Sequence, residues 1–171
     1  MSHDIEHELC TRPTSGTAVS LVAQRLRLEM MDTRNGLMHD HTVRGQPDAS
    51  MTVAPAGSLD WSFNAELVWK RVAWCERFGN APIAFEVGTS VSLALSGAHK
   101  YRFARELAGF VARDMSLPVT FSVVDGNTSW PLREDESATV RICFPTRTLA
   151  LADGSNAVGA PMSRPVLPAG L

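Results

Sequence analysis

Two stretches in the second half of the chain decide its fold: Val119–Asp125, with the sequence VTFSVVD, and residues 138–144, with the sequence ATVRICF. Both are rich in β-branched and aromatic residues, which predicts strands. A polar segment with the turn residues Asp-Gly-Asn joins them, so they form a hairpin-like pair. In the second stretch every other residue is apolar, and side chains on a strand alternate between its two faces. One face therefore carries Ala138, Val140, Ile142 and Phe144, and the other carries Thr139, Arg141 and Cys143.

The elements around this pair follow from periodicity and from turn residues. Apolar side chains at helical spacing predict helices at residues 17–31, around residues 61–75 with an end at Gly79, and at residues 98–115. Strands are expected at residues 5–10, 37–42, 50–54 and 82–95, the second and third of these separated by a loop or joined as a hairpin. Strands with interleaved helices and a hairpin-like pair indicate an α+β fold, in which helices pack on a mostly antiparallel sheet.

Length and composition limit the classes of protein. The chain has 171 residues, a formal net charge of -2 and 44% hydrophobic residues, which suits one folded domain. We divide it into an N-terminal segment at 1–16 with a first strand, a domain at 17–152 and a Gly/Ala/Pro-rich tail at 153–171 that we expect to be irregular. It has no run of 18 apolar residues and no signal-like start, so we expect a cytoplasmic protein without membrane partners.

Motifs for catalysis and cofactor binding are sparse. The sequence contains no phosphate-binding P-loop, no dinucleotide fingerprint and no nucleophile elbow, and no cofactor is expected. His39 and His41, two residues apart on an expected strand, are the candidate metal ligands because their side chains would share a face. A metal would need further ligands, so we favour the interpretation that both are surface histidines.

Three stretches, taken in order and spacing over about residues 17–154, resemble the N-terminal nicking domain of MobA/MobL-type conjugative relaxases. The first joins the helix with Ala18 and Arg25 to the pattern Asp32-x-Arg34-x-Gly36-x-x-His39-Asp40-x-Thr42. The second is residues 68–72 (VWKRV) with the following strand that contains Glu86. The third is residues 103–107 (FAREL) with the strand ending at Asp125 and residues 138–147 (ATVRICFPTR). The resemblance implies a single relaxase-like (HUH-endonuclease-like) domain with a five-stranded sheet.

The resemblance also implies where catalytic residues would lie. In that family a tyrosine on the first helix attacks a DNA phosphodiester, and three histidines hold a divalent metal that polarises the phosphate. Here the tyrosine position falls on Gln24, the first histidine on Val124, and a His-x-His pair on Thr139 and Arg141. Glutamine cannot form the phosphotyrosyl link, and valine and arginine cannot coordinate the metal. The resemblance therefore implies a degenerate active site and a pseudoenzyme rather than an enzyme.

The leading hypothesis is a catalytically inactive relaxase-like protein that modulates conjugative transfer or a mobile element. It would bind DNA, single-stranded or hairpin, or a relaxosome or regulatory partner. Arg141, with Arg25 and Thr139, is the candidate phosphate-binding group, because a guanidinium then replaces the metal charge. Equally, Arg141 could pair with a nearby acidic residue: Glu134, Glu136 or Asp125.

Two alternatives belong to other functional classes. The chain could be a protein-interaction module that pairs with a relaxase, a transfer regulator or a second copy of itself, without binding DNA. The net charge of -2 favours this alternative, since bulk electrostatics do not draw the chain to nucleic acid. It could also be a metal-dependent nuclease rebuilt around His39, His41 and Asp125.

Overall fold

A five-stranded antiparallel sheet organises the chain, with the strand order β1-β5-β7-β6-β4. The computed structural model describes residues 5–11, 16–75, 82–92, 94–125, 137–149 and 158–161. The strands of this sheet are β1 (Ile5–Thr11), β4 (Ala49–Val53), β5 (Pro82–Ser92), β6 (Val119–Asp125) and β7 (Ser137–Pro145). The sheet confirms the α+β class and the antiparallel pair formed by the VTFSVVD and ATVRICF stretches.

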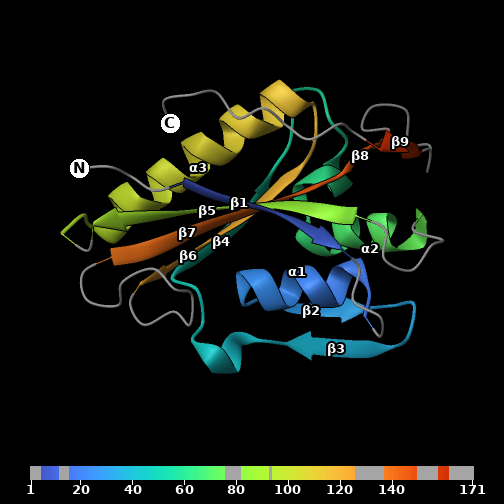
Figure 1. Ribbon diagram of the computed structural model, residues 1–171, viewed down its shortest axis with the longest axis horizontal. Coiled ribbons are helices and arrows are strands. Elements are labelled where there is room, and N and C mark those ends of the chain that lie inside the picture. Colours follow the sequence, from blue (N-terminus) through green and yellow to red (C-terminus); the bar gives the residue numbers. More distant parts are fainter. Residues whose placement is uncertain are drawn as a thin grey trace.

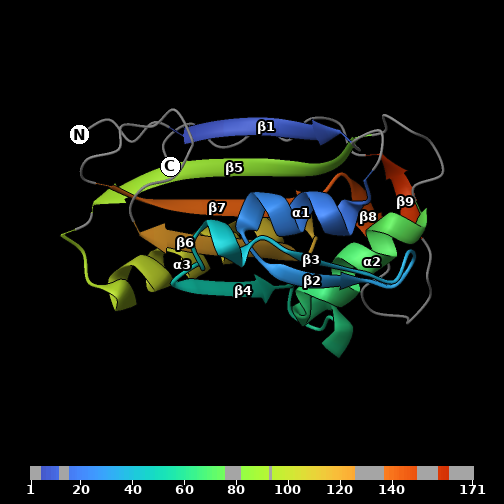
Figure 2. The same cartoon turned by 90° about the horizontal axis from the view of Figure 1, so that it is seen from below.

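Helices cover both faces of this sheet (Figure 1). Helix α3 (Gly97–Met115) lies on one face. The other face carries α1 (Ala18–Leu26), α2 (Ala65–Cys75) and a separate hairpin of β2 (Glu29–Asp32) and β3 (Leu37–Asp40). Seen from that side, α1 lies across the middle of the sheet, with β1 and β4 at opposite edges (Figure 2). Short 3-10 helices η1 (Thr42–Arg44) and η2 (Asp60–Phe63) flank β4.

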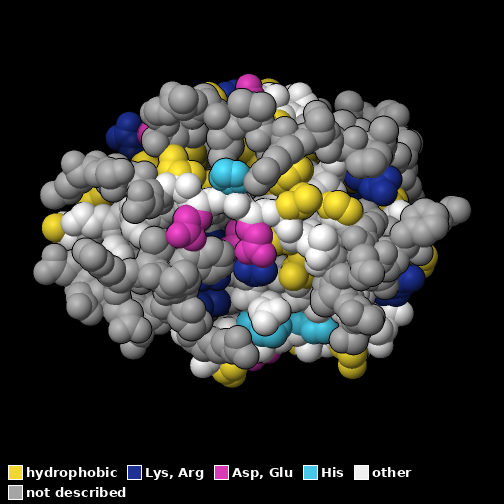
Figure 3. Space-filling model, viewed as in Figure 1, with side chains coloured by type: hydrophobic (Ala, Val, Ile, Leu, Met, Phe, Trp, Pro, Cys, Tyr) yellow, Lys and Arg dark blue, Asp and Glu magenta, His cyan; other side chains and the backbone are white. Residues whose placement is uncertain are grey.

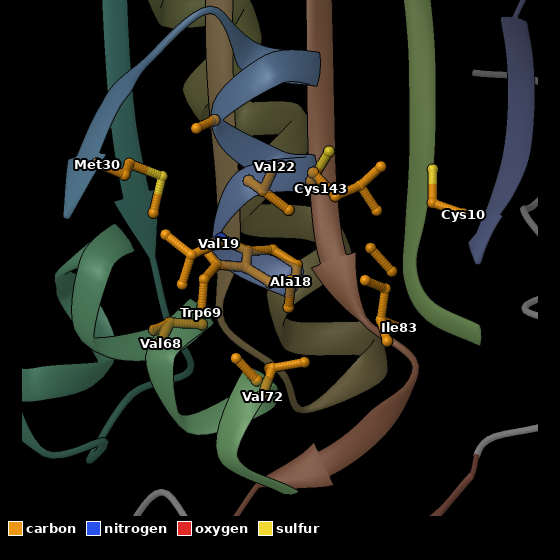
Figure 4. Packing of buried hydrophobic residues seen from close by; sticks show 14 of the residues in the cluster. Cys10, Ala18, Val19, Val22, Met30, Val68, Trp69, Val72, Ile83 and Cys143 are labelled. Carbon is orange, nitrogen blue, oxygen red and sulfur yellow. The ribbon is translucent and has the colours of Figure 1, made fainter. Parts of the chain in front are cut away.

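The sheet separates two hydrophobic clusters. The cluster under α3 includes Ala138, Val140, Ile142 and Phe144, the face that alternation in β7 predicted to be apolar. The opposite cluster joins α1 and α2 to the sheet around Val19, Val22, Trp69 and Cys143 (Figure 4). The indole nitrogen of Trp69 donates to the hydroxyl of Thr120 on β6 over 3.0 Å, so α2 is fixed to a polar position of the strand.

The first helix is shorter than predicted. Helical spacing extended it to residue 31, but α1 ends at Leu26 because Arg27 adopts a left-handed conformation with φ 56°. The chain then turns, and Glu29–Asp32 forms β2. Leu28 lies after the end of the helix, but it still packs against the hydrophobic cluster that joins α1 and α2 to the sheet. The apolar spacing therefore correctly predicted that this segment contributes to the core, but it predicted the wrong secondary structure after Leu26.

Other differences concern partners and boundaries. The strands expected at 37–42 and 50–54 do not form a hairpin: β3 pairs with β2, whereas β4 pairs with β6 in the main sheet. Strand β1 is the edge of that sheet, so residues 5–11 belong to the same layer as residues 82–92. Within the tail expected to be irregular, β9 (Val158–Pro161) pairs with β8 (Arg147–Leu149). The expected helix end at Gly79 lies outside the described residues.

No helix in the described ranges is both long enough and apolar enough to cross a membrane.

Candidate functional site

The four positions that the resemblance assigned to the active site come from α1, β6 and β7. Val124 on β6 and Thr139 on β7 are registered partners, and Arg141 lies two residues further along β7 opposite Ser122. The Nη1 of Arg141 donates to the backbone carbonyl of Arg25, the residue after Gln24 on α1, over 3.0 Å. Strand register and this hydrogen bond bring α1, β6 and β7 together.

This face of the sheet is polar in composition but is covered by α1. Thr139 is 5% exposed and Arg141 9%, whereas Gln24 is exposed. A side chain at the Gln24 position faces solvent, and those on β7 lie beneath the helix. Neither a phenol nor an imidazole occupies any of the four positions.

A network of buried charges fills the space between β1, β5, β7 and α1. Glu86 on β5 is 1% exposed, and its Oε2 lies 3.3 Å from Arg25 Nη1. The Arg141 Nε lies 4.0 Å from Glu86 Oε1, an oxygen that accepts no hydrogen bond from the described residues. Arg25 also makes a two-pronged contact with Glu8 on β1, at 3.1 and 3.2 Å. Arg25 thus links two carboxylates, one buried and one half-exposed.

Burial and the ion pairs both shift the pKa values of the groups in this network, and burial is the larger single effect on each group. Burial raises the pKa of Glu86, and the charges of Arg25 and Arg141 oppose that rise. Burial lowers the pKa of Arg141, against the attraction of Glu86. The pKa of Arg25 is raised: burial lowers it, but Glu86 and the neighbouring Cys10 and Glu8 outweigh that effect. Arg25 therefore stays positively charged between the carboxylates of Glu8 and Glu86.

The sheet edge seen in Figure 3 exposes part of this network. Acidic and basic side chains adjoin near the middle of that face, where β1 lies above α1 in Figure 1. The Arg25 side chain is 28% exposed and that of Glu8 is 47% exposed. A hollow of about 420 Å³ beside them is lined by β1 and β5 residues that include Glu6, Glu8 and Glu86. Of the two arginines bound to Glu86, Arg25 is the one that an external anion could reach.

One group of three metal-ligating residues occurs among the described residues: Glu8, Cys10 and Glu86, whose ligand atoms all lie within 4.8 Å of one another. Two observations disfavour a metal there. Arg25 already occupies a cationic position against both carboxylates. Burial and the charge of Glu86 raise the pKa of the Cys10 thiol to about 12, so it stays protonated near neutral pH. The donor set therefore fits the guanidinium it holds better than a metal ion.

The candidate metal ligands His39 and His41 lie in the outer layer, away from the β7 face. His39 is on β3, with its Nε2 3.9 Å from Asp32 Oδ2, and His41 follows the end of that strand. They do not share a strand face as the spacing suggested, because β3 ends at Asp40. The side chain of Asp125, their expected third partner, is outside the described residues.

The pattern from Asp32 to Thr42 folds as the β2–β3 hairpin. Asp32 is 1% exposed and accepts from the Thr17 hydroxyl at 2.5 Å and from the Arg34 backbone N–H at 3.0 Å. Gly36, with φ +71°, occupies the turn. Asp40 accepts from both the backbone N–H and the hydroxyl of Thr42. These residues order a hairpin, and this accounts for their pattern without any catalytic role.

Sequence reasoning missed the partners of Arg141 and Arg25. The acidic partners expected for Arg141 were close to it in the sequence, and of these Glu134 and Glu136 are outside the described residues. The carboxylate that faces Arg141 in the structure is that of Glu86. The available signal was a single glutamate in the middle of an otherwise apolar strand, PIAFEV. A buried charged acid of this kind needs a cation from another element, here Arg25 on α1 and Arg141 on β7.

Comparisons with known proteins address the fold alone. No family model and no curated protein matches the sequence. The structure is similar to a solved structure described as "Molecular Basis of Vancomycin Resistance Transfer in Staphylococcus aureus", with a TM-score of 0.75 and 16% sequence identity. The match covers 94% of this chain and 76% of the other. A likeness at this identity establishes a shared architecture.

Proposed function

We propose that this protein is a catalytically inactive relaxase-like domain that binds DNA through the Arg25 edge of the sheet and modulates conjugative transfer. The observation that supports the proposal is that none of the four positions to which the resemblance assigns a catalytic residue holds that residue. Gln24, Val124, Thr139 and Arg141, on α1, β6 and β7, stand where the resemblance implies a tyrosine and three histidines, and none of them is either. The sequence resemblance and the fold shared with a protein of resistance transfer support the same theme.

The implied catalytic positions lack a tyrosine and histidines, and the half-exposed cation of the site, Arg25, is the group that a phosphate would contact. Attack on a phosphodiester needs an activated nucleophile and concentrated positive charge at the phosphate. Arg25 offers a planar guanidinium that suits a phosphate, and in this structure Glu8 occupies its outer side. We propose that a DNA phosphate exchanges with the half-exposed Glu8, while the buried Glu86 keeps the guanidinium in place. Arg141 acts indirectly, because it fixes the α1 backbone that carries Arg25.

The test combines binding with cleavage. A labelled hairpin oligonucleotide is titrated with wild-type protein and with Arg25→Ala, and anisotropy gives the dissociation constants at low salt. We expect about a fivefold loss of affinity for Arg25→Ala, which corresponds to about one phosphate contact. Arg34→Ala, exposed in the turn between β2 and β3, is the matched control for a lost arginine. Thermal unfolding of each variant shows whether the fold is kept.

Incubation of the same DNA with the wild-type protein and Mg²⁺ or Mn²⁺ tests the catalytic half of the proposal. We expect neither a nicked strand nor a covalent protein–DNA adduct on a denaturing gel. A cleavage product that Arg25→Ala removes would contradict inactivity. Equal affinities of the wild-type protein and Arg25→Ala for DNA would contradict the binding site.

A protein-interaction role is the second candidate, because the outer hairpin presents apolar side chains to solvent. Leu37 is 55% exposed, Met38 50% and Val43 83%, on β3 and the adjoining η1. Contiguous apolar residues at a surface are typical of protein contacts. The partner could be a relaxase, a transfer regulator or a second copy of the chain. Sedimentation of the wild-type protein against Met38→Lys/Val43→Lys tests self-association, and an unchanged monomer in both would exclude the second copy.

A further inference from the structure

A second charged surface lies at the opposite edge of the sheet from Arg25, between α3 and the edge strand β4 (Figure 2). It is a groove of about 970 Å³. Its lining includes Met51, Phe63, Tyr101, Arg102, Arg105 and Arg113. None of these residues belongs to the network around Glu86 or to the positions that the resemblance assigns to the active site.

The arginines of this α3–β4 groove lie along one side of the helix. Arg105 and Arg113 are 3 and 11 positions beyond Arg102, which places them within one stripe at 3.6 residues per turn. All three side chains are exposed. The acidic residue in the lining is Glu106, and it pairs with Arg102 at 2.8 Å. Three guanidiniums and one carboxylate give the groove a local charge of about +2, on a chain whose net charge is -2.

Aromatic side chains accompany the arginines. Phe63, at the end of η2, is 49% exposed, which leaves an apolar ring facing the groove. Tyr101 is held more firmly: its ring lies 5.9 Å from that of Phe121, and its hydroxyl donates to Met51 Sδ over 3.3 Å. A further hollow of about 290 Å³ shares Tyr101 and is also lined by Lys100. That hollow adds little charge to the groove, because Lys100 is 3% exposed and the acidic Asp48 also lines it.

We propose that the α3–β4 groove binds single-stranded nucleic acid, with Arg105 and Arg113 contacting phosphates and Phe63 stacking on a base. Proteins that bind single strands without sequence preference combine a positive groove along the backbone with aromatic platforms for the bases. An acidic peptide would use the arginines but has no group that needs an exposed Phe63. The two binding edges are independent, because β1 and β4 lie at opposite ends of the strand order.

The experiment titrates a labelled oligothymidine of about 12 nucleotides and measures its affinity by anisotropy at several salt concentrations. For Arg105→Ala/Arg113→Ala we expect at least about a tenfold loss of affinity at low salt. We also expect the slope of log K against log salt to become shallower by about 1.4, or about 0.7 for each phosphate contact on a single strand. The control Arg105→Lys/Arg113→Lys retains the charges, so its salt slope stays that of wild type.

Phe63→Ala separates stacking from charge. Loss of one base–aromatic contact should weaken binding by roughly tenfold and leave the salt slope unchanged. In the Arg25→Ala background, Arg105→Ala/Arg113→Ala should weaken oligothymidine binding by the same factor as in wild type, because the two edges are separate. If only Arg25→Ala weakens it, the Arg25 edge binds the strand and the proposal for the groove is wrong.

Three further results would overturn the proposal for the groove. One is the absence of oligothymidine binding by the wild-type protein, and another is an unchanged salt slope in the double alanine variant. The third is binding of poly-glutamate as tight as that of oligothymidine, together with no effect of Phe63→Ala. That result would assign the groove to an acidic protein partner.

Discussion

The guanidinium of Arg141 on β7 donates a hydrogen bond to the backbone carbonyl of Arg25 in the last turn of α1, over 3.0 Å. The same guanidinium faces the buried carboxylate of Glu86 at 4.0 Å. One side chain therefore joins the helix to two strands of the sheet. It stands at a position where the relaxase resemblance implies a metal-binding histidine.

Arg141→Leu should destabilise the fold. It removes one cation from Glu86, which remains buried, and it leaves the Arg25 carbonyl without this donor. Breaking a buried ion pair from one side costs about 3 kcal/mol. Urea unfolding followed by tryptophan fluorescence measures the change in the free energy of unfolding.

The double variant Arg141→Leu/Glu86→Leu provides the control for that measurement. It removes both charges, and Arg25 keeps its contact with Glu8. We expect it to be more stable than Arg141→Leu alone, because it also removes the buried Glu86 carboxylate, which in Arg141→Leu keeps Arg25 as its cation but loses Arg141. If the two variants are equally unstable, the loss comes from packing and the ion pair contributes little.

Glu8→Gln should leave stability almost unchanged and raise the affinity for DNA. The Glu8 side chain is 47% exposed, and exposed ion pairs contribute at most about 1 kcal/mol. Removing its charge frees the outer side of Arg25 for a phosphate, so affinity for a hairpin oligonucleotide should rise about threefold. Anisotropy titration measures this rise. Glu29→Gln, on β2 and exposed, is the control for the added net charge. An equal rise in both variants would show a bulk charge effect rather than competition at Arg25.

The extent of successful prediction from sequence depended on whether a feature was local. Alternation in residues 138–144 identified the apolar face of β7 correctly, and helical spacing located α3 almost to its ends. The end of α1 at a left-handed Arg27 has no glycine to mark it, so periodicity carried the helix too far. The pairing of β4 with β6 joins residues about 70 positions apart, and no local signal specifies it.

The candidate site, too, was predicted only where it depends on residues close together in the sequence. The position of Arg141 on the polar face of β7 was predictable, but its acidic partner lies on β5 in a register that only the folded sheet defines. The contact of Arg25 with Glu8 depends in turn on β1 being the neighbour of β5. The partners expected for Arg141 were acidic residues close to it in the sequence. The glutamate that faces it in the folded sheet lies on another strand.

Cys10 should make the protein less stable as pH rises above 9. The pKa of its thiol is about 12 in the folded state, against an ordinary value of 9.0, so at intermediate pH the unfolded chain releases a proton that the folded chain retains. Its contribution to stability is therefore full below pH 9 and declines as pH rises toward 12. From about pH 8 to about pH 10, one such thiol lowers the free energy of unfolding by about 1.4 kcal/mol.

Cys10→Ala tests this contribution, because the variant lacks this thiol and keeps the other titrating groups. We expect the variant to lose less stability than wild type over that pH interval, by about 1.4 kcal/mol, in urea unfolding followed by fluorescence. Parallel declines would show that the Cys10 thiol ionises as readily in the folded chain as in the unfolded one. The burial of Cys10 beside Glu86 would then not control its titration.

Thr17→Val should destabilise α1 and the β2–β3 hairpin together. The Thr17 hydroxyl donates to the buried Asp32 and accepts from the backbone N–H of Ser20, so it caps the helix and satisfies the hairpin carboxylate. Valine keeps the shape but removes both bonds, at a cost of about 2 kcal/mol. Thr17→Ser retains the hydroxyl and should lose less than half as much in urea unfolding. The distinguishing readout is amide hydrogen exchange: faster exchange in Thr17→Val should occur at both α1 and β2. Faster exchange at α1 alone would mean that Asp32 does not depend on this hydroxyl and that the helix and the hairpin are stabilised separately.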